Sequence, residues 1–422
     1  MRGPRKLGRG VAIVGAGSSR FGAFPDRASR EIFVDAFVET LASVDKGIDP
    51  KEIEALYLGC FSGDLFEGQG HLAPIIADWI GLTPKPAVRV EGACGSSGLA
   101  LRQGIMAIAS GLYDLVLVGG VEKMTSLPTD RVTDALAAAS DVIYEAAIGF
   151  TFPGVFAAIA TAYLDRYGAA PEHLMRVAIK NHENAALNPK AHFSQTIRAI
   201  MEARREKTRQ RGGAIPNWRD EMDFLRDPQA NPVVAWPLRL FDCSPISDGA
   251  TCLLICAEEI AREFTDDPIR VVASAHASGG ALASWDGLTS IPAARIAAQQ
   301  AYEMAGIGPK EVQLAEVHDC FTIAEIVALE DLGLVGPGRG AWATAEGVTA
   351  RDGLVPVNTS GGLKAKGHPV GATGAAQVME IWHQLRGQAG ARQVGGRDLR
   401  LGLAHNIGGT GGTCVVHILE RR

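Results

Sequence analysis

The sequence predicts an α/β protein built from two similar halves, with a further segment inserted between them. Near-continuous apolar runs such as VAIVGAG at 11–17 alternate with helix-like stretches, which is typical of buried strands connected by helices. One block, GIDPKEIEALYLGC at 47–60, recurs later as GIGPKEVQLAEVHDC at 306–320. The chain of 422 residues, 47% of them hydrophobic, is also long enough to form more than one core.

The repeat continues through the next elements of each half. The stretch VRVEGACGSSGLALRQGIMAIASG at 88–111 corresponds to SGGLKAKGHPVGATGAAQVMEIWHQLRG at 360–387. After it, YDLVLVGGVEKM at 113–124 corresponds to LRLGLAHNIGGTGG at 399–412. Because duplicated halves are expected to pack around a pseudo-twofold axis, we expect their turns to meet at one shared site.

The segment between the two halves has a different composition from its neighbours. It contains the basic helical run MEARREKTRQRGG, several prolines and two tryptophans. The apolar run GATCLLICAEEI, which follows it, is predicted to be a strand that returns to the first half. The predicted units are an N-terminal half, an inserted loop domain and a C-terminal half, at 1–125 plus 239–265, 126–238 and 266–422 respectively.

Charge and hydropathy exclude several classes of partner. A net charge of −6 leaves no overall basic stripe for nucleic acid. No apolar run approaches the roughly 20 residues of a membrane-spanning helix, and the basic start MRGPRKLGRG leads directly into a predicted strand. The partial GxGxxG motif in VAIVGAG has Arg20 at its third glycine position, which argues against a dinucleotide site. We therefore expect a cytoplasmic protein with no nucleic-acid or membrane partner.

The pattern of cysteines argues against disulfide bonds and leaves two of the cysteines as candidates for a reactive role. There are seven, an odd number, dispersed and with no CxxC pair, so we predict neither a disulfide framework nor a zinc site. Cys252 and Cys256 lie in the apolar run TCLLIC and are predicted to be packing residues. Cys94 and Cys320 differ, because their neighbours are small or polar. No bound metal is expected.

Cys94 lies in EGACGSSG, where every neighbour from Gly92 to Gly98 is glycine, alanine or serine. If VRV ends a strand and SGLALRQGIMAIA forms a helix, the thiol stands at the N-terminus of that helix, where unpaired N–H groups favour a thiolate. The small neighbours would let backbone donors and a substrate carbonyl approach the sulfur. The alternative is a helix-capping turn that carries an incidental buried cysteine.

Two further turns carry histidines. His318 begins HDCF, where a His, an Asp and a Cys follow a predicted strand, and His368 lies in GHPVGATG before a predicted helix. His368 is the counterpart of Cys94 in the other half, and a neutral imidazole within reach of a thiol can activate it. An ordinary polar surface turn is the alternative for His318, and a helix start that needs glycine and proline is the alternative for His368.

In their order along the chain, these motifs resemble those of the thiolase superfamily, in particular its bacterial and archaeal acetyl-CoA acetyltransferases and the thiolase domain of sterol carrier protein 2. The resemblance runs almost end to end, through VAIVGAGSSRFG, EGACGSSG, GGVEKM, KNHENAALNP, SDGA, EVHDCFT, NTSGGLKAKGHPVGATG and HNIGGTGG. It implies thiolase-like duplicated α/β halves in a layered αβαβα core with an inserted loop domain. It also implies thioester chemistry on coenzyme A, as substrate and product, with no permanently bound cofactor.

The resemblance implies a role for each turn. Cys94 resembles the nucleophile that accepts the acyl group, and His368 resembles the base that activates it. His318 and His368 would bind the enolate oxygen of a second acetyl-CoA, while the backbone N–H groups of Cys94 and Gly408 would bind the acyl-enzyme oxygen. The implied activity is that of an acetyl-CoA C-acetyltransferase, which interconverts two acetyl-CoA with acetoacetyl-CoA and CoA by a ping-pong mechanism.

One departure from the family pattern concerns the second cysteine. Better-known thiolases carry a proton-shuttling cysteine in the final glycine turn, where this chain has Asn406, and they have Asn-Glu-Ala-Phe in place of HDCF. The sterol-carrier branch supplies its second cysteine from HDCF, so Cys320 is the candidate proton shuttle. Ser244 and His182 are candidate coenzyme A-binding residues, with a turn residue and a helix-surface hydrogen-bonding residue as the respective alternatives.

Other functions stay open at this point. The alternatives are a 3-ketoacyl-CoA thiolase for longer or branched chains, a thiolase-fold aldolase acting on CoA esters, and a non-catalytic acyl-CoA-binding protein. An aldolase would be expected to lack the nucleophile that Cys94 resembles. The resemblance also implies a homodimer or homotetramer, and it makes a small zinc-and-OB-fold partner protein, which archaeal relatives often have, a hypothesis here.

Overall fold

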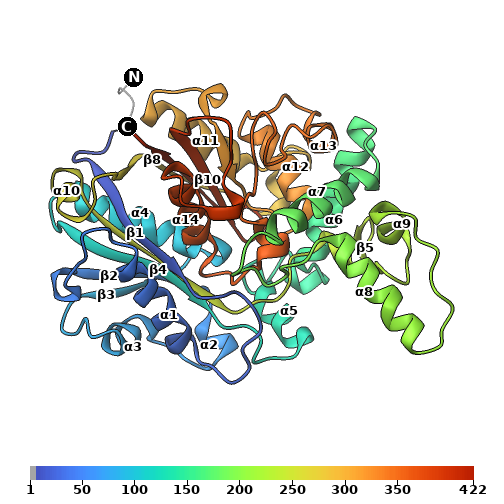
Figure 1. The fold of residues 1–422 in the computed structure, drawn as a ribbon, viewed down its shortest axis with the longest axis horizontal. Coiled ribbons are helices and arrows are strands. Elements are labelled where there is room, and N and C mark those ends of the chain that lie inside the picture. The colour runs from blue at the N-terminus through green and yellow to red at the C-terminus, as the bar shows by residue number, and fades with distance from the viewer. Residues whose placement is uncertain (1–5) are drawn as a thin grey trace.

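The computed structural model describes residues 6–422, whose strands form one main sheet and one small separate pair (Figure 1). The main sheet has nine strands within this range, in the spatial order β3-β2-β4-β7-β1-β8-β11-β10-β9. These strands are β1 (Val11–Ser18), β2 (Ala55–Gly59), β3 (Ala87–Val90), β4 (Leu115–Glu122), β7 (Gly249–Ala257), β8 (Ile269–Ser278), β9 (Leu314–Glu316), β10 (Leu401–Gly408) and β11 (Thr413–Glu420). The separate pair is β5 (Val233–Ala235) with β6 (Leu238–Arg239).

The main sheet consists of two halves with the same internal order. In the first half β1 and β4 both pair antiparallel with β7, and β2 pairs parallel with β4. In the second half β8 and β10 both pair antiparallel with β11, and β9 pairs parallel with β10. The halves join through β1 and β8, where Ala12 lies opposite Arg270 and Ile13 opposite Ile269. The duplicated α/β halves that the sequence repeat predicts are therefore confirmed.

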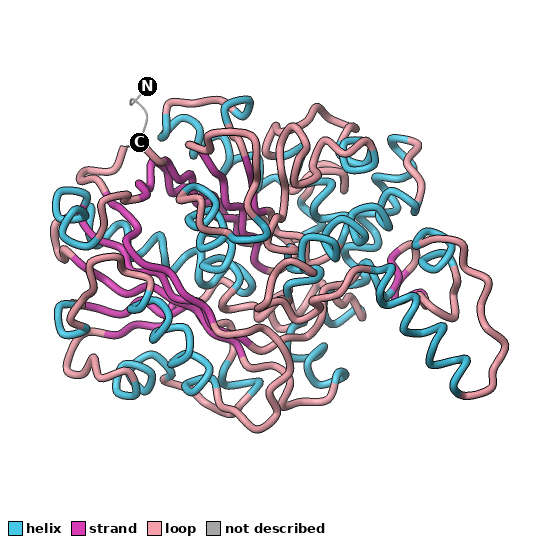
Figure 2. The backbone as a smooth tube through the Cα atoms, in the orientation of Figure 1, coloured by secondary structure: helices cyan, strands magenta, loops and turns pink. Residues whose placement is uncertain are grey.

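Helices separate and cover the two halves of the sheet. α4 (Ser96–Ala109) and α14 (Thr373–Leu385) pack against each other in the centre, and each contacts strands of both halves (Figure 2). The outer face of the first half is covered by α1 (Ser29–Ala42) and α3 (Leu72–Trp79), and that of the second half by α11 (Pro292–Ala305) and α12 (Thr322–Asp331). The result is the layered αβαβα core that the family resemblance implies.

Glycine allows α4 and α14 to approach each other closely. A Cβ at Gly374 would lie 2.3 Å from Asn406 Oδ1 and 2.5 Å from the backbone nitrogen of Gly98. Because Cβ atoms do not approach other atoms this closely in packed proteins, only glycine fits at this crossing. The crossing brings together the N-terminal ends of both helices and the turns that precede them.

The substitution Gly374→Ala is expected to lower the free energy of unfolding by about 2 kcal/mol, because the added methyl group would force the two helices apart. Denaturant unfolding followed by circular dichroism measures the change. Gly395→Ala is the matched control, since a Cβ there meets no atom within 4 Å. A Gly374→Ala chain as stable as this control would show that the crossing has room for a methyl group.

The segment predicted as an insertion contains helices of two kinds. α6 (Phe152–Tyr167) and α7 (Pro171–Ala185) pack into the apolar core of the second half. In contrast, α8 (Ile197–Gln210) and α9 (Glu221–Arg226) extend away from the sheet and share a small core that includes Met201, Trp218 and Phe224 (Figure 1). The remaining helix, α5 (Thr129–Ala137), packs near the N-terminal end of α4. The domain boundaries at 126 and 238 stay a prediction.

The buried cysteines of the first half have the role that composition predicts. Cys252 and Cys256 are fully buried in β7, so their prediction as packing residues is confirmed. All seven cysteines of the chain lie among the described residues and all are free thiols.

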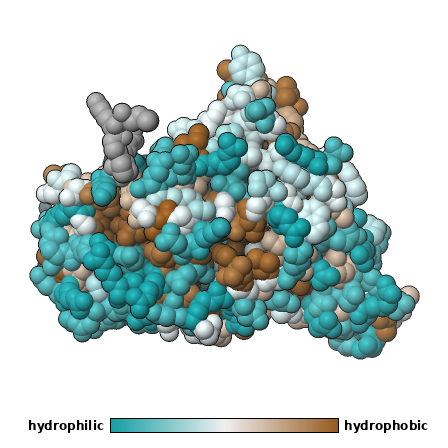
Figure 3. Space-filling model, turned by 90° about the horizontal axis from the view of Figure 1, so that it is seen from above, coloured by the Kyte–Doolittle hydropathy of each residue, from teal (hydrophilic) through white to brown (hydrophobic). Residues whose placement is uncertain are grey.

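The outer surface is mainly hydrophilic, with apolar side chains in separate patches on the face that Figure 3 shows. Among residues 6–422, no helix combines the length and the apolar character that crossing a membrane requires.

Candidate active site

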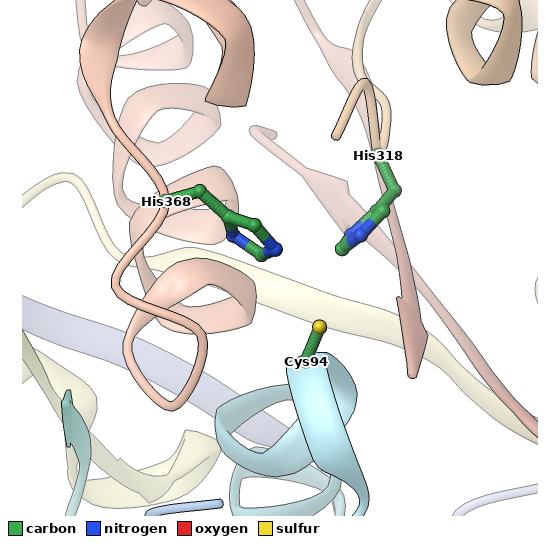
Figure 4. A group of neighbouring side chains, drawn as sticks. All are labelled: Cys94, His318 and His368. Carbon is green, nitrogen blue, oxygen red and sulfur yellow. The ribbon is translucent and has the colours of Figure 1, made fainter. Parts of the chain in front are cut away.

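Three turns from different parts of the chain meet where the two halves face each other (Figure 4). The side chains of Cys94, His318 and His368 point toward one another, and the Cys94 Sγ and one ring nitrogen of each histidine all lie within 4.8 Å. The two imidazole rings meet edge to face, with centroids 5.1 Å apart. Turns of both halves therefore share one site, as the repeat predicts.

Cys94 lies in a 3₁₀ turn, Ala93–Gly95, directly before α4. Ala93 has a φ of 51°, in the left-handed region that residues other than glycine rarely adopt. Ser96 holds the turn, because its hydroxyl accepts from the Gly92 N–H at 3.1 Å and donates to the Ala93 carbonyl at 2.6 Å. A Cβ at Gly92 would lie 2.4 Å from Leu99 Cδ1, and a Cβ at Gly98 would lie 2.7 Å from Asn406 Oδ1, which explains why bulk is excluded at these two positions.

The electrostatic environment of Cys94 differs from the helix-stabilised thiolate that the sequence predicts. Burial raises the pKa of this thiol to about 12, and the nearby Glu122 acts in the same direction. The backbone N–H of Gly409 hydrogen-bonds to the sulfur and lowers the pKa, but its effect is smaller than that of burial. The thiol is therefore protonated in the unliganded chain, and it needs a base to become a nucleophile.

Burial gives both histidines the character of neutral bases. It lowers the pKa of His368 to about 3, with Lys366 as a second cause, and lowers the pKa of His318 well below its usual value. His368 Nδ1 lies 2.7 Å from Thr373 Oγ1, and His318 Nδ1 lies 3.2 Å from Asn406 Nδ2. Both rings are uncharged near neutral pH and are held at Nδ1, which leaves Nε2 of each ring for chemistry.

The same three side chains could also hold a metal ion. Within residues 6–422, their ligand atoms lie close enough together to bind a single metal ion. One thiolate and two imidazoles form a donor set that Zn²⁺ accepts. Sequence spacing could not reveal this group, because its members come from three distant turns and form no local motif. The expectation that no metal is resident stays a prediction.

Cys320 lies beside this group, on the turn that follows β9. Burial raises the pKa of its thiol well above the usual value, and the nearby Cys94 is the next cause. The Cys320 carbonyl accepts a hydrogen bond of 2.9 Å from the Ser244 N–H, and Cys243 pairs with Phe321 in an isolated β-bridge. The segment before β7 therefore holds the HDCF turn in place, with a second protonated thiol near the first.

Asp319, at the centre of the HDCF turn, connects two of the three turns. Its carboxylate accepts hydrogen bonds from the N–H groups of Leu363 and Lys364 at 2.6 and 3.2 Å. These residues belong to the helical turn that leads to His368. Asp319 therefore fixes the spacing between the turns that carry the two histidines. Sequence reasoning did not single it out, although its place inside HDCF was a signal.

A cavity of about 390 Å³ opens onto these side chains. Sequence-predicted site residues that line it are Cys94, Ser244, His318, Cys320 and His368. Much of the remaining wall is apolar and comes from the inserted segment and its neighbours, including Leu136, Phe152, Phe156, Val234, Leu240 and Val370. The structure thus joins the reactive groups to a space with the apolar lining that an acyl chain requires.

His182 does not line this cavity. It is 1% exposed and contacts the rings of Phe193 and Phe241, with Nδ1 2.9 Å from the Gln195 carbonyl oxygen. The alternative of a helix-surface residue is wrong, because the buried face of α7 carries this side chain. The coenzyme A-binding role of His182 stays a prediction.

Gly408 is placed against the Cys94 turn rather than at the cavity wall. Its backbone packs on Gly92, since a Cβ at Gly408 would lie 1.9 Å from the Gly92 carbonyl oxygen. The next residue, Gly409, lines the cavity and directs its N–H at the Cys94 sulfur. The predicted oxyanion role of Gly408 stays a prediction, and Gly409 is a second backbone donor that sequence reasoning missed. The run of glycines in HNIGGTGG was the available signal.

The chain matches two thiolase family profiles. Residues 11–259 match the family described as thiolase, N-terminal domain, and residues 273–421 match the thiolase C-terminal domain-like family. Together these matches cover both halves and the segment between them.

Individual proteins align over nearly the whole chain. An acetyl-CoA acetyltransferase of Methanothermobacter thermautotrophicus is 45% identical over 98% of this chain and 100% of the relative. Sterol carrier protein 2 of Gallus gallus is 30% identical over 97% of this chain and 71% of that protein. Among solved structures, the Ltp2-ChsH2(DUF35) aldolase has the same fold, with a TM-score of 0.79 at 24% identity over 99% of both chains. The chain therefore belongs to the thiolase family and is an acyltransferase of that family.

Proposed function

We propose that the chain is an acetyl-CoA C-acetyltransferase that works by a ping-pong mechanism through an acyl-Cys94 intermediate. The observation that carries this proposal is the approach of a thiol and two neutral imidazoles to within 4.8 Å at the wall of a largely apolar cavity. The name of the 45% identical relative supports acetyl-CoA as the acyl donor. Coenzyme A is then both substrate and product, with no permanently bound cofactor in the scheme.

The first half-reaction transfers the acyl group to Cys94. The Thr373 hydroxyl donates to the Pro369 carbonyl at 3.1 Å, so its oxygen accepts from His368 Nδ1–H at 2.7 Å and His368 Nε2 is unprotonated. This nitrogen takes the thiol proton as Sγ attacks the thioester carbon, and the proton then passes to the departing CoA sulfur. Backbone N–H groups at Cys94 and Gly408 are proposed to stabilise the tetrahedral oxyanion.

The second half-reaction forms or cleaves a carbon–carbon bond. In condensation, Cys320 first gives its own proton to His368 Nε2, and the Cys320 thiolate then removes a proton from the methyl group of a second acetyl-CoA. The resulting carbanion attacks acyl-Cys94, whose sulfur leaves and takes the proton back from His368. In thiolysis the Cys320 thiol gives its proton to the acetyl-CoA carbanion that leaves acetoacetyl-CoA. The raised pKa of Cys320 supports the protonated form that thiolysis uses. His318, together with His368 while its Nε2 carries a proton, is proposed to donate hydrogen bonds to the enolate oxygen.

The size of the cavity supports a second candidate substrate class. Its volume of about 390 Å³ has to hold the acyl group as well as the reacting end of the CoA arm. Its wall also includes several large apolar side chains, which would pack against an acyl chain longer than acetyl. A 3-ketoacyl-CoA with a longer or branched chain is therefore the second candidate. Ser244, which lines the same cavity, is proposed to contact the CoA arm.

We also propose that the chain works as a homodimer or homotetramer and binds a small zinc-and-OB-fold partner protein. The motifs shared with archaeal thiolases support the partner, and the name of the Ltp2-ChsH2(DUF35) aldolase joins a second component to a chain with this fold. Full activity of the purified chain alone, with a single species in light scattering, would argue against the partner.

An isotope-exchange experiment tests the proposed function. The natural chain is incubated with acetyl-CoA and labelled CoA, without another acyl acceptor. A ping-pong enzyme moves the label into acetyl-CoA, because the acyl-enzyme reacts back with labelled CoA. An aldolase or an acyl-CoA-binding protein would leave the label in free CoA, which would contradict the proposal. Thiolysis rates with acetoacetyl-CoA and with longer 3-ketoacyl-CoA esters then rank the two substrate classes.

A further inference from the structure

The two histidines of the site differ in the group that holds Nδ1. For His368 this group is a hydroxyl whose own hydrogen is already given to a carbonyl. For His318 it is the side-chain nitrogen of Asn406, 3.2 Å away. The same nitrogen donates a hydrogen bond of 3.0 Å to the Cys94 carbonyl. Because an amide NH₂ has two hydrogens and is not an acceptor, it can only donate to His318 Nδ1.

One orientation of the Asn406 amide suits its two neighbouring acceptors, and it leaves Oδ1 without a hydrogen-bond partner among residues 6–422. Asn406 is 1% exposed on β10, behind the site. In the reverse orientation Oδ1 would face the Cys94 carbonyl oxygen, so two acceptors would oppose each other in a buried place. Oδ1 instead lies against the close crossing of α4 and α14, where a Cβ at Gly98 would come within 2.7 Å of it. The Cys94 carbonyl therefore fixes the amide.

We infer that Asn406 is a positioning residue that sets the tautomer of His318, with the hydrogen on Nε2 and the lone pair on Nδ1. His318 then offers an N–H donor to the site, while His368 offers an unprotonated nitrogen. The two imidazoles are alike in burial, yet one is prepared as a hydrogen-bond donor and the other as a base. This division rests on the proposed function, but the tautomer itself is measured without catalysis.

The inference explains why asparagine stands at this position. Better-known thiolases have a cysteine there, and a thiol has a single, weak S–H donor. Such a side chain could not donate to the Cys94 carbonyl and to His318 Nδ1 together. Once Cys320 supplies the second thiol, position 406 is free to hold a residue with two donors. The backbone N–H of His318 donates to His405 Nδ1 at 3.5 Å, so His405 contacts the His318 backbone and leaves His318 Nδ1 to Asn406.

Nitrogen NMR of the chain labelled with ¹⁵N-histidine tests the tautomer directly. The His318 signals are those lost in a His318→Gln variant. In the natural chain without substrate, we expect Nδ1 of His318 to show the shift of an unprotonated nitrogen and Nε2 that of a protonated one. The opposite pattern would overturn the inference, even if the isotope exchange confirmed the ping-pong mechanism.

The Asn406→Asp variant provides a second test. A carboxylate can only accept at this position, so we expect the His318 hydrogen to move to Nδ1 and acetoacetyl-CoA thiolysis to fall about 100-fold, as for the loss of one oxyanion donor. Gln377→Glu is the matched control, since Gln377 is also a fully buried amide and donates to the His405 carbonyl at 2.9 Å. It should leave the His318 tautomer unchanged.

Two results of the variant experiment would count against Asn406. A variant that keeps the hydrogen on Nε2 would show that another group sets the tautomer, and a tautomer change in the control would show a general response to buried charge. If Asn406→Asp does not fold, the spectrum of the natural chain still decides the question.

Discussion

Replacing Cys94 with alanine is expected to abolish acylation by acetyl-CoA and to lower the rate of acetoacetyl-CoA thiolysis by about 10⁴-fold or more. The alanine side chain fits a turn already built from small residues, so the cavity and both imidazoles should remain in place. Intact-mass spectrometry after mixing with acetyl-CoA should show one added acetyl group on the natural chain and none on Cys94→Ala. The variant would lose the reaction and keep the fold, because the proposed mechanism makes this sulfur the attacking atom.

Cys243→Ala is the control for this experiment, because Cys243 lines the same cavity and is also a free thiol whose pKa burial raises to about 12. It should retain the adduct. An adduct of equal amount on Cys94→Ala would assign the acyl group to another residue. Turnover by the natural chain with no adduct would instead favour the aldolase mechanism.

The raised pKa of Cys94 makes the surrounding bases essential to the proposal. At a pKa of about 12, roughly one thiol in 10⁵ would be ionised at pH 7 without help. The low pKa of His368 keeps its imidazole neutral, with one ring nitrogen unprotonated, over the whole physiological range. Neither group is reactive by itself. The proposed reaction depends on the short distance between them, which lets the imidazole take the proton of the thiol.

The duplicated fold could be predicted because its signals are local and occur twice. PKE follows a glycine-containing turn in both halves, and each copy forms a short 3₁₀ turn, Pro50–Glu52 or Pro309–Glu311, directly before a strand. Proline fixes the first turn of each copy whatever packs around it. The two packing modes of the inserted helices could not be predicted, because they depend on which core each helix meets.

The site could be predicted only as far as local sequence determines it. Cys94 and His368 were found because each precedes a helix in a turn of small residues. The direction of the Cys94 pKa shift was wrong, since the helix N-terminus is visible in the sequence but the burial that outweighs it is a tertiary property. The helix-surface alternative for His182 was wrong for the same reason, because a polar helix pattern does not show that aromatic rings cover this residue.

Replacing Cys320 with alanine is expected to leave acylation of Cys94 within a few-fold of the natural chain while lowering acetoacetyl-CoA thiolysis by about 10³-fold, the range of general acid–base effects. In the proposed mechanism its thiol supplies the proton for the leaving carbanion, a step that acylation by acetyl-CoA does not contain. The isotope exchange between acetyl-CoA and CoA reports acylation alone, and thiolysis reports both half-reactions. The ratio of the two rates therefore isolates the contribution of Cys320.

The same pair of measurements distinguishes a proton shuttle from a packing residue. The Cys320 side chain is buried close to Cys94, so a purely structural role would slow exchange and thiolysis together. Unchanged thiolysis would transfer the proton step to one of the two histidines. Cys243→Ala again serves as the control, since Cys243 lines the same cavity and its backbone pairs with Phe321, the neighbour of Cys320. Only a shuttle predicts that exchange survives while cleavage fails, with the control normal in both.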